Sequence, residues 1–279
     1  MKKTLILLLT VLIFGCKNEK KTNGKLNIVT TTTMITDLVK NIGGEHINLQ
    51  GLMGSGVDPH LYKASEGDVT KLSNADIIFY NGLHLEGKLV EVFEKMKNKK
   101  TVAVSEALDK STLIGSEYFA SNYDPHIWFD IEYWKQATQF VVSTLSEAIP
   151  EQKIAFEANG KKYIEQLNAL KTKLETTINS LQKEQRILVT AHDAFNYFGK
   201  AFDFEVIGLQ GLSTATEAGV QDVQKLSAFI IENKLKAIFV ESSVPKRTIE
   251  ALQASVKSKG HEVSIGGTLY SDALGDAGT

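Results

Sequence analysis

The segment PEQKIAFEANGKKYIEQLNALKTKLETTINSLQ, residues 150–182, decides how the chain is organised. Pro150 suits the first turn of a helix, and the rest of the segment contains no further proline and one glycine, Gly160. Apolar side chains recur every three or four residues and form one helical stripe, which consists of Tyr163, Leu167, Leu170, Leu174, Ile178 and Leu181. A helix of about 33 residues would be about 50 Å long, which exceeds what one small domain needs. The segment therefore predicts a helix that joins two lobes, with a coiled coil as the alternative because the spacing is also heptad-like.

Short apolar runs alternate with amphipathic segments on both sides of this helix. Strands are predicted at 26–30, 47–53, 77–80, 101–104, 186–190, 205–209, 237–240 and 262–265. Helices are predicted at 34–42, from Ser65 onward, and at 86–97, 194–200, 221–235 and 245–259. Alternation of this kind implies mainly parallel sheets covered by helices. The predicted fold is two α/β lobes, at 26–149 and 184–279, joined by a long rigid helix at 150–183.

The composition is that of a globular protein and excludes some partners. Hydrophobic residues make up 43% and charged residues 23% of the chain, which are ordinary globular values. The formal net charge is −2, and no basic stripe is interleaved with aromatic residues. We therefore expect no nucleic-acid partner.

The amino terminus predicts export and a lipid anchor. Lys2 and Lys3 precede an apolar run at 5–14 that is too short to span a bilayer, so residues 1–15 are interpreted as a signal peptide. Cys16 is the only cysteine and cannot form an internal disulfide. Its position after Gly15 resembles a bacterial lipobox, which implies lipidation of Cys16. The polar residues at 16–25 are predicted to be a flexible tether that holds the folded part outside the cytoplasm.

Four candidate metal ligands lie in separate segments. His60 and His126 each end an Asp-Pro-His tripeptide, His192 follows a buried-looking strand, and Asp272 follows Tyr-Ser. Three imidazoles and a carboxylate suit a divalent transition metal. Two of these residues fall in each predicted lobe, so they can meet only in the crevice between the lobes, where ligands bind in open α/β sheets. Glu241 ends a predicted strand and could orient a histidine beside the metal.

The motifs together resemble a known family. The lipobox, both Asp-Pro-His segments, Asn-Gly-Leu-His-Leu-Glu at 81–86, His-Asp-Ala-Phe at 192–195 and Tyr-Ser-Asp at 270–272 are similar to the solute-binding lipoproteins of bacterial ABC importers for zinc and manganese. The resemblance implies two lobes that move little, metal ligands at His60, His126, His192 and Asp272, and a monomer that serves a membrane permease with its cytoplasmic ATPase. It also implies an extracytoplasmic location, in the periplasm or at the cell surface, and a last helix beyond Thr279.

The choice of metal and two rival functions stay open at this point. Imidazole donors favour zinc, but the histidine-rich loop of many zinc-dedicated members has no counterpart, since residues 109–123 contain no histidine. A zinc-dependent hydrolase with a three-histidine site is one rival, although no His-Glu-x-x-His helix is present. A cell-adhesion protein stabilised by metal is the other. Of the remaining histidines, His46 and His261 are expected to be exposed, and His84 to lie near the mouth of the crevice.

Overall fold

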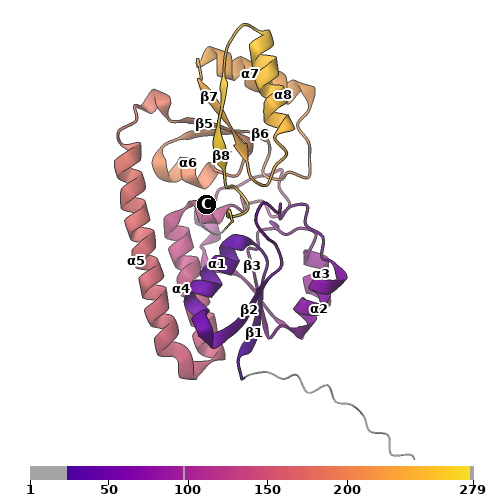
Figure 1. Ribbon diagram of the computed structural model, residues 1–279, viewed down its shortest axis with the longest axis vertical. Helices are drawn as coiled ribbons and strands as arrows, with labels where there is room; N and C mark the ends of the chain where they lie inside the picture. Colours follow the sequence, from indigo (N-terminus) through magenta and orange to yellow (C-terminus); the bar gives the residue numbers. More distant parts are fainter. Residues whose placement is uncertain (1–23, 97, 277–279) are drawn as a thin grey trace, which may run out of the picture.

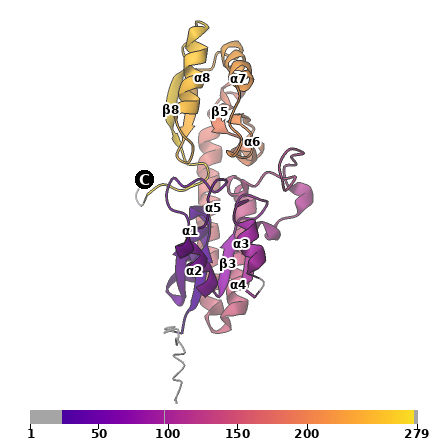
Figure 2. The same ribbon diagram turned by 90° about the vertical axis from the view of Figure 1, so that its right-hand side faces the viewer.

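The computed structural model describes residues 24–96 and 98–276, which form two α/β lobes beside one long helix (Figures 1 and 2). The predicted fold class is confirmed. The predicted signal peptide, Cys16 and most of the predicted tether lie outside the described residues. Within the described part of the chain, no helix combines the length and the apolar composition that crossing a bilayer requires.

The first lobe is built on one parallel sheet. Its strands are β1 (Leu26–Thr30), β2 (Ile47–Gly51), β3 (Ile77–Tyr80) and β4 (Lys100–Ala103), in the order β2-β1-β3-β4. Its helices are α1 (Thr33–Gly43), α2 (Glu66–Asn74), α3 (Val90–Lys95) and α4 (Ile131–Ala148). Apolar clusters lie on both faces of this sheet, as expected for parallel strands. Helix α2 begins with a capping box, in which the side chains of Ser65 and Asp68 each accept a hydrogen bond from the other's backbone N–H.

The joining helix, α5 (Lys153–Ile178), is 26 residues long and runs beside both lobes (Figure 1). It is shorter than predicted, because Pro150–Gln152 form a 3-10 turn and the α-helix ends at Ile178. Gly160 allows α4 to pack closely, since a Cβ atom there would lie 2.5 Å from Val142 Cγ2. Tyr163 donates a hydrogen bond to Asp37 of α1 at 3.1 Å. Tyr163, Leu167, Leu174 and Ile178 of the stripe pack against apolar clusters of this chain, whereas Leu170 and Leu181 are exposed. Most of the stripe thus faces the lobes, as a joining helix requires.

The second lobe holds two pairs of parallel strands. Strands β5 (Ile187–His192) and β6 (Glu205–Gln210) form one pair, and β7 (Ala237–Glu241) and β8 (Ser264–Leu269) form the other. Strands β5 and β7 lie side by side. The helices are α6 (Asn196–Phe202), α7 (Val220–Glu232) and α8 (Arg247–Ser258), and the apolar core lies between α7, α8 and the strands.

Two helices of the first lobe differ from the sequence prediction. Helix α4 was not predicted, although Asp130 caps it by accepting hydrogen bonds from the N–H groups of Glu132 and Tyr133. The helix predicted at 86–97 begins only at Val90. Glu86 cannot serve as a solvated helix residue, because its buried carboxylate accepts the Asn81 N–H and the Thr31 hydroxyl at 2.7 and 2.6 Å. These bonds hold the preceding loop instead.

Candidate metal site

The four predicted ligands meet between the lobes. His60 lies on the loop after β2, His126 directly precedes a 3-10 turn at Ile127–Phe129, His192 ends β5, and Asp272 follows β8. Each offers one ligand atom, and these atoms all lie within 4.8 Å of one another. The parallel topology explains the convergence, because β2, β5 and β8 all end with their carboxyl ends facing this crevice.

The cluster is buried and its donor atoms lack partners. His126 and His192 are 0% exposed, Asp272 is 1% and His60 is 4% exposed. Among the described residues, no hydrogen bond satisfies the Nε2 atoms of the three histidines or either Asp272 oxygen. Buried polar atoms are nearly always paired, so five unpaired ones in one place require an explanation. A cation at their centre would satisfy all of them.

Asp272 lies among the three imidazoles. Its Oδ2 atom is 3.2 Å from His192 Nε2 and 3.8 Å from His60 Nε2, and its Oδ1 atom is 3.5 Å from His126 Nε2. The carboxylate therefore faces three nitrogen donors from both lobes. Three neutral imidazoles and one carboxylate form a ligand set that suits zinc and related divalent ions.

Two of the three imidazole rings are oriented by buried carboxylates. His126 Nδ1 lies 2.7 Å from Asp124 Oδ1, and His192 Nδ1 lies 2.6 Å from Glu241 Oε2. The same carboxylates accept the backbone N–H groups of these histidines, each at 2.9 Å. A proton held on Nδ1 leaves Nε2 as the free donor, which points the lone pair into the cluster. Glu241 was predicted for this position, whereas Asp124 was not, although the repeated Asp-Pro-His motif is the signal that could have found it.

His60 is held differently. Asp58, the aspartate of its own motif, accepts the His60 backbone N–H at 2.8 Å and the hydroxyl of Thr214 at 2.5 Å. The Phe119 ring meets the His60 ring edge to face, with centroids 6.5 Å apart. Sequence reasoning missed both Phe119 and Thr214, because neither residue type is a metal ligand and neither lies in a motif.

Burial and charge move the pKa values of three cluster members. Burial lowers the pKa of His60 to about 3, an effect that Asp272 only partly offsets. For His192, burial also favours the neutral form, but the carboxylates of Asp272 and Glu241 outweigh it and raise the pKa well above its ordinary value. The pKa of Asp272 is held well below its usual range, because attraction to His192, His126 and His60 outweighs burial. Asp272 is therefore ionised.

The other three histidines lie apart from this cluster. His46 contacts the edge of Phe156 and is half-buried, and His261 is half-buried with Nε2 2.9 Å from the Leu235 carbonyl, so neither is as exposed as expected. His84 is exposed and meets Phe119 edge to face at 6.1 Å. Phe119 therefore lies between His84 and His60, which places His84 at the outer side of the site.

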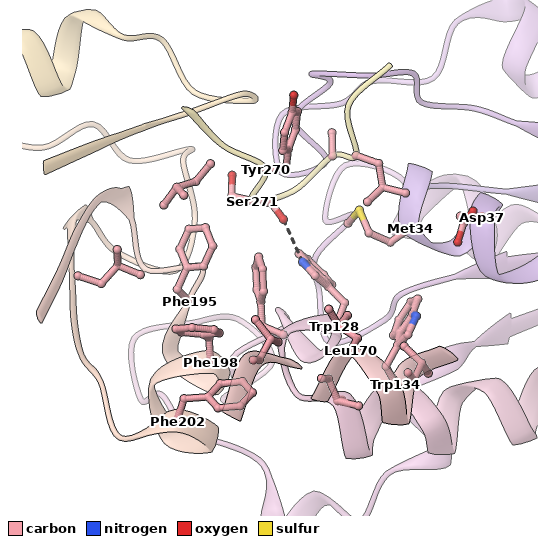
Figure 3. Close-up of a pocket in the computed structure, with 18 of the residues that line it drawn as sticks. Met34, Asp37, Trp128, Trp134, Leu170, Phe195, Phe198, Phe202, Tyr270 and Ser271 are labelled. Carbon is pink, nitrogen blue, oxygen red and sulfur yellow. Dashed lines mark hydrogen bonds between the residues drawn. The ribbon is translucent and has the colours of Figure 1, made fainter. Parts of the chain in front are cut away.

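An apolar cavity of about 530 Å³ lies beside the four clustered residues, between the two lobes and α5 (Figure 3). Phe195, Phe198 and Phe202 line it from the second lobe, and Trp128 and Trp134 line it from the first. None of the four clustered residues lines it. Trp128 Nε1 donates to the Ser271 carbonyl at 2.9 Å, which ties the residue before Asp272 to the first lobe. The cavity wall offers no set of metal donors.

Comparison with known protein families identifies one family that this chain matches over most of its length. The family described as zinc-uptake complex component A, periplasmic (ZnuA) matches residues 28–279. The chain belongs to this family. The zinc-binding protein TroA of Treponema pallidum is 49% identical over 95% of this chain and 86% of that relative. The manganese-binding lipoprotein MntA of Bacillus subtilis is 45% identical over 98% of this chain and 90% of that relative.

A solved structure agrees with the arrangement of the lobes. The periplasmic zinc-binding protein TroA from Treponema pallidum superposes with a TM-score of 0.89 at 50% identity and covers 92% of both chains. The predicted family is thereby confirmed, and the likeness spans both lobes and the helix between them.

Proposed function

We propose that this protein captures a divalent transition metal between its lobes and delivers it to the permease of an ABC importer. His60, His126, His192 and Asp272 are the proposed ligands, and Glu241 and Asp124 orient two of the rings. One observation carries the assignment: five buried donor atoms from both lobes converge without hydrogen-bond partners among the residues that the structure describes. Family membership supports it, since the family is described as a component of zinc uptake.

Zinc is the proposed cargo, with manganese as the second candidate. Three of the four donors are imidazole nitrogens, which suit zinc better than the harder manganese ion. The relatives do not distinguish zinc from manganese, because TroA is named as zinc-binding and MntA as manganese-binding at similar sequence identity. Competition between the two ions for the purified protein measures the preference directly.

The donor set disfavours the hydrolase alternative. A catalytic zinc keeps one coordination position open for water beside three protein ligands. Here a fourth protein donor, Asp272, lies within 4 Å of all three imidazole Nε2 atoms and is itself 1% exposed. A buried site closed by four protein donors suits capture and release of an ion. The relatives are named as metal-binding proteins and not as enzymes.

The finer assignments concern the membrane and the organisation of the chain. We infer that Cys16 is lipidated and anchors the monomer outside the cytoplasm, which the name of MntA as a lipoprotein supports. The proposed units are the signal peptide at 1–15, the tether at 16–25, the first lobe at 26–149, the helical linker at 150–183 and the second lobe at 184–279. Cys16→Ala should release the protein from membrane fractions, while retention there would contradict the anchor.

Elemental analysis of protein purified without added metal tests the function itself. We expect one equivalent of zinc or manganese in the parent protein and none after His126→Ala and His192→Ala are combined. The His46→Ala variant is the matched control, because His46 lies outside the cluster and should retain the metal. A parent protein that takes up no divalent ion would overturn the proposal.

A further inference from the structure

The three ring ligands are not held alike. Buried carboxylates bind the Nδ1 atoms of His126 and His192 at 2.7 and 2.6 Å. In the part of the chain that the structure describes, Nδ1 of His60 makes no hydrogen bond to a carboxylate. The oxygens of Asp58 are directed instead to the His60 backbone and to Thr214. The His60 ring is therefore the one whose orientation depends on its chain segment and on packing against Phe119.

Beside His126, hydrogen bonds to Asp124 connect the two lobes next to the apolar core. Asn196 of α6 donates to the free oxygen of Asp124 at 3.0 Å, and the Tyr197 hydroxyl donates to the Asp124 carbonyl at 3.0 Å. Tyr197 is 0% exposed and packs within the apolar core of the first lobe, although it belongs to a second-lobe helix. Helix α6 of the second lobe is thus anchored in the core of the first lobe beside His126.

Beside His60, the two lobes are connected through residues that lie in irregular segments. Asp58 lies on the connection between β2 and α2, and Thr214 lies on the connection between β6 and α7. Their side chains meet across the two lobes in a part-buried hydrogen bond. Leu61, the residue after His60, is 50% exposed, so the segment reaches the surface one residue beyond the ligand. Irregular connections of this kind open more easily than helices embedded in a core.

We propose that Thr214 is a positioning residue for His60, and that His60 is the ligand that leaves first when the ion is released. The Thr214 hydroxyl holds the Asp58 carboxylate across the crevice, and Asp58 in turn holds the His60 backbone. When this bond parts, the His60 segment moves outward, while His126, His192 and Asp272 stay in place through Asp124, Glu241 and the Trp128 contact to Ser271. The inference rests on the proposed function and adds an order of release to it.

The test is the rate at which zinc leaves the loaded protein in excess chelator. Thr214→Val keeps the shape of the side chain and removes the hydroxyl, so we expect dissociation about tenfold faster, because the lost hydrogen bond is to a charged group. Thr214→Ser restores the hydroxyl and should return the rate to that of the parent. Thr216→Val is the control, because Thr216 is an exposed threonine on the same segment.

Melting of the metal-free variants separates positioning from a merely structural role. We expect both metal-free variants to unfold cooperatively, with Thr214→Ser melting like the parent and Thr214→Val melting only slightly lower, because the hydrogen bond to Asp58 is also present without the ion. A parental dissociation rate for Thr214→Val, equally fast release from Thr214→Ser, or loss of cooperative unfolding in Thr214→Val would each overturn the proposal. A parent protein that binds no zinc would instead contradict the proposed function, so the two failures are distinguishable.

Discussion

The same tripeptide, Asp-Pro-His, occurs twice beside the proposed metal site and is used in two ways. In the second copy, Asp124 orients the His126 ring and also receives Asn196 from the other lobe. In the first copy, Asp58 reaches the other lobe through Thr214 but holds only the backbone of His60. The difference comes from the surroundings, since Asp124 and His126 are 0% exposed and lie against a core helix. Equal motifs therefore need not contribute equally to affinity or to release.

Metal binding should have the largest effect on the stability of the folded state, because the ion joins both Asp-Pro-His motifs to the second lobe. An ion present at a thousandfold excess over its dissociation constant stabilises the folded state by about 4 kcal/mol. We expect thermal melting to show this gain with zinc for the parent protein. An unchanged melting temperature with both zinc and manganese would contradict a site shared between the lobes.

Loss of a ligand should separate the two motifs. His126→Ala and His192→Ala should each weaken zinc binding more than about 100-fold, because removing even an outer partner costs 10–100-fold. His60→Ala should weaken binding less than either, since the His60 ring is held least firmly. Calorimetric titration measures the three affinities, with His261→Ala as the control that should bind like the parent. A His60→Ala variant that binds more weakly than His126→Ala would reverse the proposed order.

The aspartates of the two motifs allow a sharper comparison than their histidines. Asp124→Asn removes the charge that holds the His126 ring, so we expect affinity to fall about 10–100-fold. Asp58→Asn leaves an oxygen that can still accept the His60 N–H, so its loss of affinity should be near the lower end of that range. Equal losses in zinc titrations of the two variants would show that the motifs act alike.

The dependence on pH distinguishes the His192 ring, whose Nδ1 atom is bound by a buried carboxylate, from the His60 ring. Zinc must displace the proton of His192, whose pKa is raised by Asp272 and Glu241, whereas His60, with a pKa of about 3, is already neutral. Below the raised pKa, affinity should fall about tenfold for each unit of pH. In the metal-free protein the sign is opposite. The paired, protonated His192 stabilises the fold at low pH, and this contribution is lost as pH rises from about 6.5 through the raised pKa.

Thermal melting with and without zinc, from about pH 6.5 upward, checks the direction of both pH effects. We expect the contribution of His192 to metal-free stability to decline with rising pH, while the additional stabilisation by zinc increases. The His192→Ala variant provides the control, since both trends should be reduced without this imidazole. A zinc effect that does not change with pH would contradict competition between the ion and the proton.

Much of the fold follows from local sequence pattern, and the exceptions have physical causes. The strands at Leu26–Thr30 and Ile77–Tyr80 match the prediction, because short β-branched runs bounded by polar residues are unambiguous. Helix α4 was missed because its first residue, Ile131, closely follows the apolar residues of the 3-10 turn at Ile127–Phe129, so the pattern of apolar residues does not mark where the helix begins. The helix predicted from residue 86 begins only at Val90, because the Glu86 carboxylate is buried and accepts hydrogen bonds from the Asn81 N–H and the Thr31 hydroxyl.

The convergence of the candidate ligands was predictable from the sequence. The residues that hold these ligands in place were predictable only in part. Spacing and motif placed His60, His126, His192 and Asp272 on opposite lobes, and strand order then brings them together. Thr214 and Asn196 could not be identified, because each acts only through a contact with an aspartate more than 70 residues away. Contacts of this kind depend on the docking of the lobes, which no local pattern encodes. The predicted continuation beyond Thr279 stays a prediction.

Nuclear magnetic resonance of the histidine rings during zinc titration tests the central claim most directly. The chain contains six histidines, so every ring can be followed separately. The account predicts that the resonances of His60, His126 and His192 change together and saturate at one equivalent of zinc. His46 and His261 should stay unchanged. Saturation without a change at one of the three clustered rings, or a primary response at His46 or His261, would contradict a single site formed by both lobes.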